Sequence, residues 1–386
     1  MRKNTTVIVI EHGPQGRPVH FDAPRRWLVA ERQADVLPVL DAAEAARRAG
    51  AWVAGYLGYE AGFAMEPRLT ALDRGSGAPL ICLGVFDAPG PADPVLQRAA
   101  TTAEATTLAP LAPGINRAAY DRAFAQLQDF LAAGDCYQVN LTFPVHTRLT
   151  TGTPLGLYGA LRARQPVGFG AYLDLPDGRV IVSRSPELFF RLTDNILESR
   201  PMKGTAPRSG DAVQDAQLKA ALAASEKVQA ENLMIVDLLR NDIGRISEIG
   251  SVRVPELFAI ESYATVHQMS SRIQGRLIAG AGLPEIMAAL FPCGSVTGAP
   301  KIRAMQIIAA LEPHPRGAYC GAIGWAAPDG DQCWSVAIRS LQIDAQGAIL
   351  ANVGGGVVQD STAEGEWEEA LWKTRYAQAL VTTACV

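Results

Sequence analysis

Short apolar runs separated by turn-forming residues make up most of this chain. Runs such as VIVI, WVAGYLGY and LICLGVF occur before residue 90, and GFGAYLDL, GRVIVSRS and ELFFRLTDNILES occur between 168 and 199. Further runs lie around 252–276 and in AYCGAIGWAA, QCWSVAIRSLQID and AILANVGGGVV. Their length and their content of β-branched and aromatic residues are typical of strands. The pattern therefore predicts a strand-rich protein.

Apolar residues at helical spacing occur in fewer places. They predict helices near 36–49, from Asn116 to Gly134, about 211–240, 284–290, after Pro300, and from about 363 to 382. The second of these has the clearest signals, because Asn116 is a good N-cap and Gly134 a good terminator. Four of its apolar residues share one face: Tyr120, Phe124, Leu127 and Leu131. Strands in groups, not in strict alternation with helices, favour an α+β fold.

The composition indicates a folded protein with a large core. Of 386 residues, 48% are hydrophobic and 19% charged, and 35 Lys and Arg against 39 Asp and Glu give a net charge of −4. This balance argues against disorder and against a nucleic-acid partner. No apolar run approaches the roughly 18 residues of a membrane helix. The opening MRKNTTVIVIEHG also lacks the features of a signal peptide. We therefore expect a cytoplasmic enzyme without nucleic-acid or membrane partners.

The cysteines predict neither a zinc site nor a disulfide scaffold. None of the six forms a C-x-x-C pair, and six are too few for a scaffold in a chain of 386 residues. We expect them to be small core residues: Cys82, Cys136, Cys293, Cys320, Cys333 and Cys385.

A carboxylate lies on the apolar stripe of the helix predicted at 211–240. Glu231 falls within about 60° of Val228 and Ile235 on a helical wheel. Burying an ionised carboxylate costs several kcal/mol unless it is paired, protonated or bound to metal. Glu231 is thus a candidate metal ligand, and a buried ion pair with Lys227 is the alternative.

Two carboxylates near the C-terminus are one helical turn apart. Glu366, Glu369 and Lys373 share one stripe of the predicted helix. Carboxylates in this arrangement suit a hard cation such as Mg²⁺, which takes oxygen ligands. The alternative is a solvated acidic first turn that the helix dipole favours.

Two glycine-rich segments offer close approach of backbone to a ligand. The loop GSVTGAPK at 294–301 opens a predicted helix, but its spacing departs from that of a nucleotide-binding Walker loop. A helix N-terminus after such a loop favours an anion, including a carboxylate. The run Gly354–Gly356 is either a second approach point or a tight turn.

Two single residues also carry possible chemistry. Lys203, in SRPMKGTAPR, is a nucleophile if burial or neighbouring cations depress its pKa, and otherwise an exposed loop cation. His267, in SYATVHQMSS, fits either a catalytic or a structural role.

Together these segments resemble the chorismate-utilising enzymes, and within them the aminodeoxychorismate branch. The matching runs appear in order along the chain: GDCYQVNL (134–141), SRSPELF (183–189), RPMKGT (200–205), AENLMIVDLLRNDIGR (230–245), SVTGAPKIRAM (295–305), YCGAIGW (319–325), AIRS (337–340) and NVGGGVVQDS (352–361). Before residue 116 the similarity is looser and rests on GYLGYEAG (55–62).

The resemblance implies a fold and a division of the chain. The expected fold is α+β, one large domain with two facing antiparallel sheets and helices packed outside. Residues 1–90 would form the N-terminal part of the sheets. Residues 91–115, rich in Ala, Pro and Thr, would form a linker or an excursion, and 116–386 the chorismate-binding catalytic core.

Two positions indicate which reaction the family member performs. Relatives that add water to chorismate resemble this chain but carry lysine where Gln138 stands, so Gln138 favours ammonia as the nucleophile. Anthranilate synthases are similar at 200–205 but carry alanine where Lys203 stands. The resemblance therefore implies amination of chorismate at C4, giving 4-amino-4-deoxychorismate for 4-aminobenzoate and folate synthesis. Anthranilate synthase component I and a non-catalytic chorismate-binding protein are the alternatives.

The family pattern also implies roles for individual residues. Lys203 would attack C2 of chorismate, Glu187 would act as acid and base, and His267 would stand beside the ring. Mg²⁺ would be held by three carboxylates: Glu231, Glu366 and Glu369. Substrate contacts would come from eight further residues: Gln138, Thr205, Thr297, Tyr319, Arg339, Gly355, Gly356 and Lys373.

Ammonia would come from a separate glutamine amidotransferase subunit in a heterodimer, since no glutaminase residues are recognisable in the chain. One departure from the family pattern concerns the metal. Relatives usually carry an acidic residue three positions before the helix glutamate, where this chain has Val228, which puts the number of metal ligands in doubt.

Overall fold

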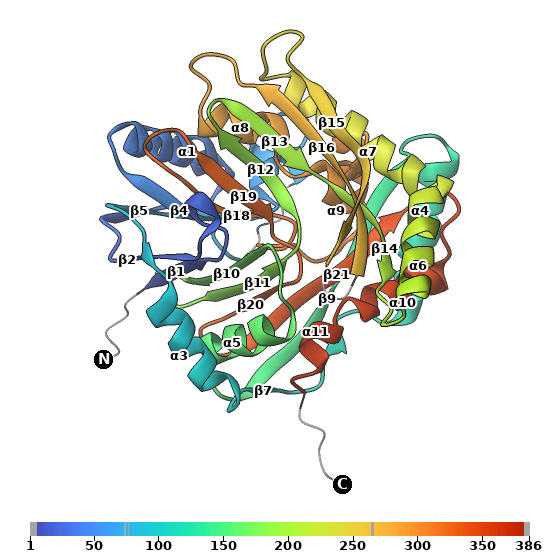
Figure 1. Ribbon diagram of the computed structural model, residues 1–386, viewed down its shortest axis with the longest axis horizontal. Helices are drawn as coiled ribbons and strands as arrows, with labels where there is room; N and C mark the ends of the chain where they lie inside the picture. The colour runs from blue at the N-terminus through green and yellow to red at the C-terminus, as the bar shows by residue number, and fades with distance from the viewer. Residues whose placement is uncertain (1–5, 73–74, 76, 264–265, 382–386) are drawn as a thin grey trace.

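Two large antiparallel sheets form the centre of the computed structural model, which describes residues 6–72, 75, 77–263 and 266–381 (Figure 1). The first sheet has 11 strands in the described part of the chain. Its main path runs β17 (Gly298–Ala299), β9 (Gln138–Thr151), β21 (Ala348–Val357), β20 (Ser340–Ile343), β11 (Val180–Ser185), β10 (Phe169–Asp174), β1 (Val7–Ile10), β2 (Val19–Asp22) and β6 (Gly90–Pro91). Off this path, β7 (Thr107–Leu108) and β8 (Ala112–Pro113) pair with β9.

The second sheet has 10 strands in the same described residues. Its path runs β14 (Met202–Pro207), β16 (Val266–Arg276), β13 (Ile196–Arg200), β12 (Leu188–Thr193), β19 (Gln332–Val336), β18 (Ala322–Ala326), β4 (Trp52–Leu57), β5 (Ile81–Phe86) and β3 (Arg26–Ala30). The remaining strand, β15 (Arg253–Ser262), pairs with β16. Each sheet is built from both halves of the sequence, so neither half makes a sheet alone.

Helices pack around the outside of the sheets (Figure 1). The helices are α1 (Gln33–Arg48), α2 (Ala61–Ala64), α3 (Asp93–Ala103), α4 (Arg117–Ala132), α5 (Pro154–Arg164), α6 (Ala212–Ala224), α7 (Glu226–Gly244), α8 (Leu283–Leu290), α9 (Lys301–Leu311), α10 (Ala363–Trp372) and α11 (Arg375–Gln378). Helix α7 packs on β16, α10 on β21 and α9 on β9. The predicted α+β architecture with two antiparallel sheets in one domain is confirmed.

The largest of three hydrophobic clusters in the described residues joins the sheets and the helices. It extends along the chain from Val9 to Leu380 and includes Val353 of the first sheet and Phe189 of the second. Five cysteines are buried and free, as expected, whereas Cys385 lies outside the described residues. In the described part of the chain, no helix has the length and hydropathy needed to cross a membrane.

The helix predicted after Asn116 is confirmed as α4. The Asn116 side chain accepts a hydrogen bond from the Ala119 N–H at 2.9 Å. Gly134 follows the helix at φ +76°, the left-handed conformation that terminates helices. The four apolar residues predicted to share a face are all buried: Tyr120, Phe124, Leu127 and Leu131.

Three sequence predictions are corrected by the structure. The helix expected over about 211–240 is two helices, because Ser225 ends α6 and its side chain caps α7. The C-terminal helix likewise breaks after Trp372 into α10 and α11. Residues 91–115 hold α3, which buries Val95 and Ala99 and packs against α5, so this segment belongs to the packed structure.

Candidate active site

The predicted nucleophile and the predicted ammonia-selective residue meet where the two sheets approach each other. Lys203 lies on β14, the edge strand of the second sheet, and Gln138 begins β9 in the first sheet. The Lys203 ammonium donates a hydrogen bond to Gln138 Oε1 at 3.2 Å. Gln138 is fully buried, and its Nε2 has no hydrogen-bond partner among the residues that the structure describes. The amide therefore keeps an unused donor beside the lysine.

Two glycines permit this approach. Gly204 follows Lys203 at φ +75°, and a Cβ there would lie 2.3 Å from Val228 Cγ1. At Gly356, a Cβ would lie 2.7 Å from Gln138 Nε2. At these distances the side chains of Val228 and Gln138 would have to move to make room for a Cβ atom, so both positions favour glycine. The backbone on either side of the Lys203–Gln138 contact is packed closely.

Burial lowers the pKa of Lys203, because a charged ammonium loses hydration in this position. The Lys373 ammonium acts in the same direction. The carboxylates of Glu231, Glu187 and Glu369 favour the charged form and oppose the shift. The lysine thus lies in an environment that increases its neutral, nucleophilic fraction.

Glu187 is a buried carboxyl group with an unused oxygen. It lies between β11 and β12, is 5% exposed, and its Oε1 has no hydrogen-bond partner. Burial raises its pKa to about 7, against the opposing effects of Ser295, Lys203 and Arg339. A carboxyl group that titrates near neutral pH suits proton transfer in either direction.

Carboxylates and a lysine surround Gly355 on the other side of the site. A Cβ at Gly355 would lie 2.8 Å from Glu366 Oε2, 3.5 Å from Lys373 Nζ and 3.6 Å from Glu369 Oε1. Lys373 Nζ donates to the Gly354 carbonyl at 2.7 Å and is 2.8 Å from Glu369 Oε1. The glycine run Gly354–Gly356 and the acidic helix α10, which the sequence predicted separately as ligand-binding segments, therefore lie next to each other.

Glu231 lies close enough to Glu366 and Lys203 for its charge to affect their pKa values. Burial raises the pKa of Glu366, and the neighbouring carboxylates of Glu369 and Glu231 raise it further. Glu231 is half-buried on α7, whereas Lys227 is exposed, so no buried pair forms between them. A bound cation would relieve the repulsion that Glu366 experiences from these neighbouring carboxylates.

The carboxylate oxygens of Glu231, Glu366 and Glu369 are the groups that would bind a divalent cation. Among the residues that the structure describes, no three His, Cys, Asp or Glu side chains are already arranged around one point as metal ligands. Glu369 is paired with Lys373, and Glu366 accepts a hydrogen bond from Ser361 at 2.7 Å. Oxygen donors of like charge that are this close fit a hard cation that retains several waters. Val228 adds no ligand, since it packs against Gly204.

Tyr319 lies just before β18, and Arg339 lies in the connection between β19 and β20. Arg339 has φ +50°, and its carbonyl accepts from the Arg184 N–H at 3.0 Å. Burial lowers the pKa of Arg339, and Glu187 and Tyr376 act against that shift. Tyr319 is 5% exposed, and burial raises the pKa of its phenol well above the usual range. Arg339 thus faces the same space as Glu187.

Two predicted site residues, His267 and Thr297, make hydrogen bonds to groups outside the predicted site, and a third, Thr205, is exposed. His267 is 1% exposed; its Nε2 is 3.1 Å from Asp215 Oδ1 and its Nδ1 is 2.9 Å from Ser262 Oγ. Thr297 is fully buried and donates to the Cys293 carbonyl at 3.2 Å. Thr205 is exposed on β14.

Sequence reasoning missed two residues that face the site. Ser295 lies beside Glu187 and lowers the pKa of that carboxyl, and it belongs to the loop that the sequence predicted only as an anion site. Tyr376 is near Arg339, and burial raises the pKa of its phenol. The hydroxyl in the GSVTGAPK loop was a usable signal for Ser295. Nothing in the sequence pattern marked Tyr376.

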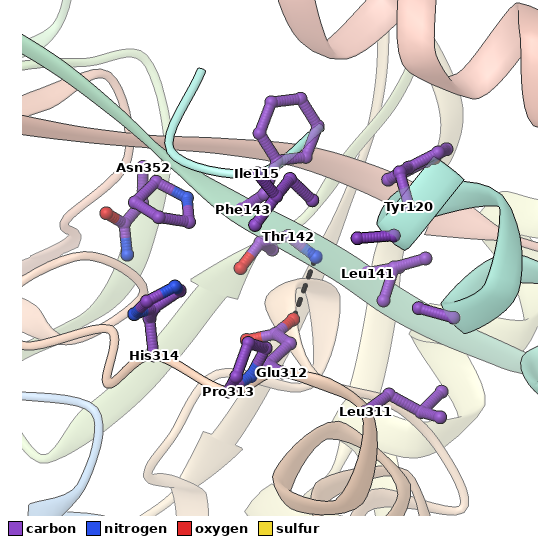
Figure 2. Close-up of a pocket in the computed structure, with 13 residues that line it drawn as sticks. Ile115, Tyr120, Leu141, Thr142, Phe143, Leu311, Glu312, Pro313, His314 and Asn352 are labelled. Atoms are coloured by element: carbon purple, nitrogen blue, oxygen red, sulfur yellow. Dashed lines mark hydrogen bonds between the residues drawn. The ribbon is translucent and has the colours of Figure 1, made fainter. Parts of the chain in front are cut away.

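A cavity of about 100 Å³ lies outside this group of residues (Figure 2). Apolar side chains from α4 and β9 line it together with the segment after α9, where Glu312 Oε1 accepts from the Thr142 N–H at 2.8 Å. None of the predicted site residues is among its lining residues. The cavity is therefore separate from the candidate active site.

The comparisons with known proteins agree with the fold and with the family resemblance. A family model described as chorismate binding enzyme matches residues 10–379. The chain is 44% identical over 259 residues to aminodeoxychorismate synthase component 1 of Klebsiella aerogenes, covering 67% of this chain and 57% of that protein. It is 39% identical over 261 residues to anthranilate synthase component 1 of Streptomyces coelicolor, covering 68% of this chain and 51% of that protein.

A solved structure extends the likeness along the chain. Anthranilate synthase component I of Streptococcus pneumoniae superposes with a TM-score of 0.76 at 25% identity, covering 97% of this chain and 90% of the other. The architecture and the ordered site residues define a chorismate-utilising class, and the chain belongs to the chorismate binding enzyme family. The matched region spans little more than half the length of the curated relatives.

Proposed function

We propose that the protein aminates chorismate at C4 and releases 4-amino-4-deoxychorismate through a covalent intermediate on Lys203. The observation that carries the proposal is the Lys203–Gln138 contact of 3.2 Å. It brings a lysine of lowered pKa to an amide that is not a base and so does not activate water. Similarity to relatives named aminodeoxychorismate synthase component 1 supports the same branch of the family.

The reaction divides into two displacements. In the first, the Lys203 amine forms a bond to C2, the ring double bonds shift, and the C4–O bond breaks as Glu187 gives its proton to the leaving hydroxyl. In the second, ammonia bonds to C4, the shift reverses, and the C2–N bond to Lys203 breaks. Glu187 takes the surplus proton from the entering amine, so chorismate and ammonia give the aminated product and water. Hydroxide is a poor leaving group, which is why an acid of raised pKa is needed.

The cationic side chains and backbone N–H groups around the site would bind the substrate. Arg339 and Tyr319 would hold the enolpyruvyl carboxylate, and the N–H groups of Gly355 and Gly356 would assist. Lys373 would stand near the ring carboxylate. The fully buried Thr297 and the exposed Thr205 would contribute to the walls of the pocket.

Glu231, Glu366 and Glu369 are the residues that would hold Mg²⁺. When bound, the ion supplies positive charge that orients the ring carboxylate and withdraws electrons from the ring. Lys373 Nζ lies 2.8 Å from Glu369 Oε1, so the lysine partly neutralises that carboxylate. The three carboxylates thus link substrate binding to a cation.

The ammonia source is a separate glutamine amidotransferase subunit in this proposal. The relatives' name, component 1, supports a partner component. The product would enter 4-aminobenzoate and folate synthesis in the cytoplasm. With the chain alone, ammonium salts would replace the partner.

The deciding experiment is mass spectrometry of the products formed from chorismate, Mg²⁺ and ammonium. We expect 4-amino-4-deoxychorismate from the wild type and no product from Lys203→Ala. Lys219→Ala is the matched control, because Lys219 is an exposed lysine on α6. A stable mass adduct on the Lys203 peptide after acid quench would identify the intermediate. Pyruvate and fluorescent anthranilate released without a lyase would refute the proposal.

Anthranilate synthesis is the second candidate, because a Streptomyces coelicolor anthranilate synthase component 1 is 39% identical. It predicts that Lys203→Ala retains or gains anthranilate formation. A non-catalytic chorismate-binding role is suggested by Val228 in place of an acidic residue. Turnover of chorismate that depends on Mg²⁺ would exclude that role.

A further inference from the structure

The Asp215 carboxylate on α6 accepts hydrogen bonds from two separate segments of the chain. Asp215 accepts from Arg208 Nε at 2.8 Å and from the Ser209 N–H at 2.9 Å, both in the loop that follows β14. Its Oδ1 is also 3.1 Å from His267 Nε2 on β16. These donors, Arg208 first, hold the pKa of Asp215 well below its usual range. Asp215 therefore ties the end of β14 to β16.

His267 completes the link. Its ring is 1% exposed and its Nδ1 is 2.9 Å from Ser262 Oγ at the end of β15. Both ring nitrogens are thus occupied, one by Asp215 and one by Ser262. An imidazole in this state has no nitrogen left for a proton of the substrate. The contacts assign His267 to holding strands and α6 together.

The position of Lys203 depends on how β14 is held. In the described residues, β14 is an edge strand that pairs only with β16, with Lys203 opposite Met269 and Ala206 opposite His267. The register shifts between Lys203 and Thr205, where Gly204 has φ +75°. Paired residues of antiparallel strands share a face, so His267 lies on the Lys203 face, next along the ladder. Because β14 is an edge strand with a register shift, the contacts of Asp215 and His267 are needed to hold its end in place.

We propose that Asp215 and His267 are positioning residues, which fix the end of β14 so that Lys203 stays against Gln138. This inference rests on the proposed role of Lys203 as the nucleophile. It differs from a role for His267 as the catalytic acid or base. Neither residue touches the substrate in this arrangement; each acts through the strand that carries the lysine.

The test uses Asp215→Ala, His267→Ala, the double variant and the conservative His267→Gln. A lost anchor moves the amine by a fraction of an ångström to an ångström. Each alanine variant should therefore lower kcat about tenfold and leave the chorismate KM within about threefold. The double variant should be no worse than either single one, because all three break the same link. Glutamine keeps a donor toward Asp215, so His267→Gln should retain most of the wild-type kcat.

A second readout does not depend on turnover. Pyridoxal phosphate followed by borohydride labels accessible neutral amines, and peptide mass spectrometry compares Lys203 with the exposed Lys219. Loss of the anchor should lower the Lys203 to Lys219 labelling ratio several-fold. Asp35→Ala is the matched control, because Asp35 makes a similar contact with Arg32 (2.9 Å) at the start of the distant helix α1. It should change neither readout.

Distinct outcomes separate this inference from the proposed function. If His267→Gln is as inactive as His267→Ala, His267 is catalytic and the positioning role is overturned. Wild-type kcat and labelling in Asp215→Ala overturn it as well. If the wild type makes no aminated product, the proposed function fails, and the labelling ratio still decides whether Asp215 positions Lys203.

Discussion

Glu187 and Lys203 show how burial tunes single residues in opposite directions. Burial raises the pKa of the Glu187 carboxyl to about 7 and lowers the pKa of the Lys203 amine. Both shifts favour the neutral form, because a low-dielectric environment disfavours charge of either sign. The proposed first displacement requires these two neutral forms together. The site is therefore poised for chemistry near neutral pH.

The pH dependence of turnover follows from Glu187. Its acid form donates the proton to the leaving hydroxyl, so kcat/KM should fall as the pH rises through about 7. Glu187→Gln should abolish this limb and lower kcat at least about 100-fold. Initial rates with ammonium at fixed free ammonia, measured from pH 6 to 9, would check it. A profile that is flat through pH 7 would contradict the assignment of Glu187 as the acid.

The same group predicts a stability effect with a defined sign. The folded pKa of Glu187, about 7, is above its unfolded value of 4.5, so the folded state holds the proton more tightly. Its favourable contribution is complete below the unfolded pKa and is lost as the pH rises to about 7, a range worth about 3 kcal/mol. Glu187→Gln should therefore raise the stability relative to wild type at pH 8 more than at pH 5. Urea unfolding at both values would measure the difference.

Gly355 predicts a selective loss of function. Its Cβ in an alanine variant would lie 2.8 Å from Glu366 Oε2 and displace that carboxylate by a few tenths of an ångström. Its φ is not in the left-handed region, so the backbone would tolerate alanine. We expect Gly355→Ala to lower kcat/KM about tenfold or more, with little change in melting temperature. Gly168→Ala is the control, because a Cβ there meets nothing within 4 Å. Equal activity of both variants would contradict the predicted role of Glu366.

At the scale of elements, most of the fold was predictable because helices and strands have strong local signals. The Asn116 cap, the α4 stripe and the terminating Gly134 need no tertiary information. The break at Ser225 was missed because apolar and alanine residues continue across it, and only the capping hydroxyl marks the junction. Helix α3 was missed because Ala, Pro and Thr suggested a linker. Its helical state depends on packing against α5.

The candidate site was likewise predicted only in part from the sequence. The resemblance to a family identified residues on β9, β14, α7 and α10, and the contacts among Lys203, Gln138 and Gly356 bring several together. Spacing alone did not connect Asp215 with His267, which are 52 residues apart. Partners from separate elements leave no periodic trace in a single sequence. Such pairings require the tertiary structure.

The N-cap residues of α4 and α7 allow a paired prediction about helix stability and metal binding. Asn116→Ala removes the cap of α4, and Ser225→Ala removes the cap of α7, so each should cost about 1 kcal/mol. Only α7 carries a predicted metal ligand, Glu231. Ser225→Ala should therefore also raise the Mg²⁺ concentration needed for half-maximal turnover, whereas Asn116→Ala should not. Urea unfolding and Mg²⁺ titrations of turnover would separate the two effects, and an equal Mg²⁺ requirement would contradict the link between α7 and the metal.

At the scale of the whole molecule, the site lies between the sheets and not on one of them. Lys203 comes from the edge of one sheet and Gln138 from the other, while Glu231 and Glu369 come from helices packed outside them. The largest hydrophobic cluster includes residues of β9, α7 and α10. The near-neutral net charge of −4 is compatible with an anionic substrate, because a few placed cations act locally and no general positive field is needed.

This arrangement predicts how ligands should affect unfolding. A ligand that bridges both sheets binds only the folded molecule, so a 100-fold excess over Kd should stabilise it by about 2.7 kcal/mol. At roughly 2 °C per kcal/mol for a chain of this size, chorismate with Mg²⁺ should raise the melting temperature by about 5 °C. Because the two larger hydrophobic clusters each include residues of both sheets, the whole unfolding transition should shift as one. Glu231→Gln should lose most of the shift, and Asp237→Asn, an exposed change on the same helix, should keep it. Scanning calorimetry that resolves two transitions, only one of them moved by the ligands, would show instead that the sheets unfold as separate units.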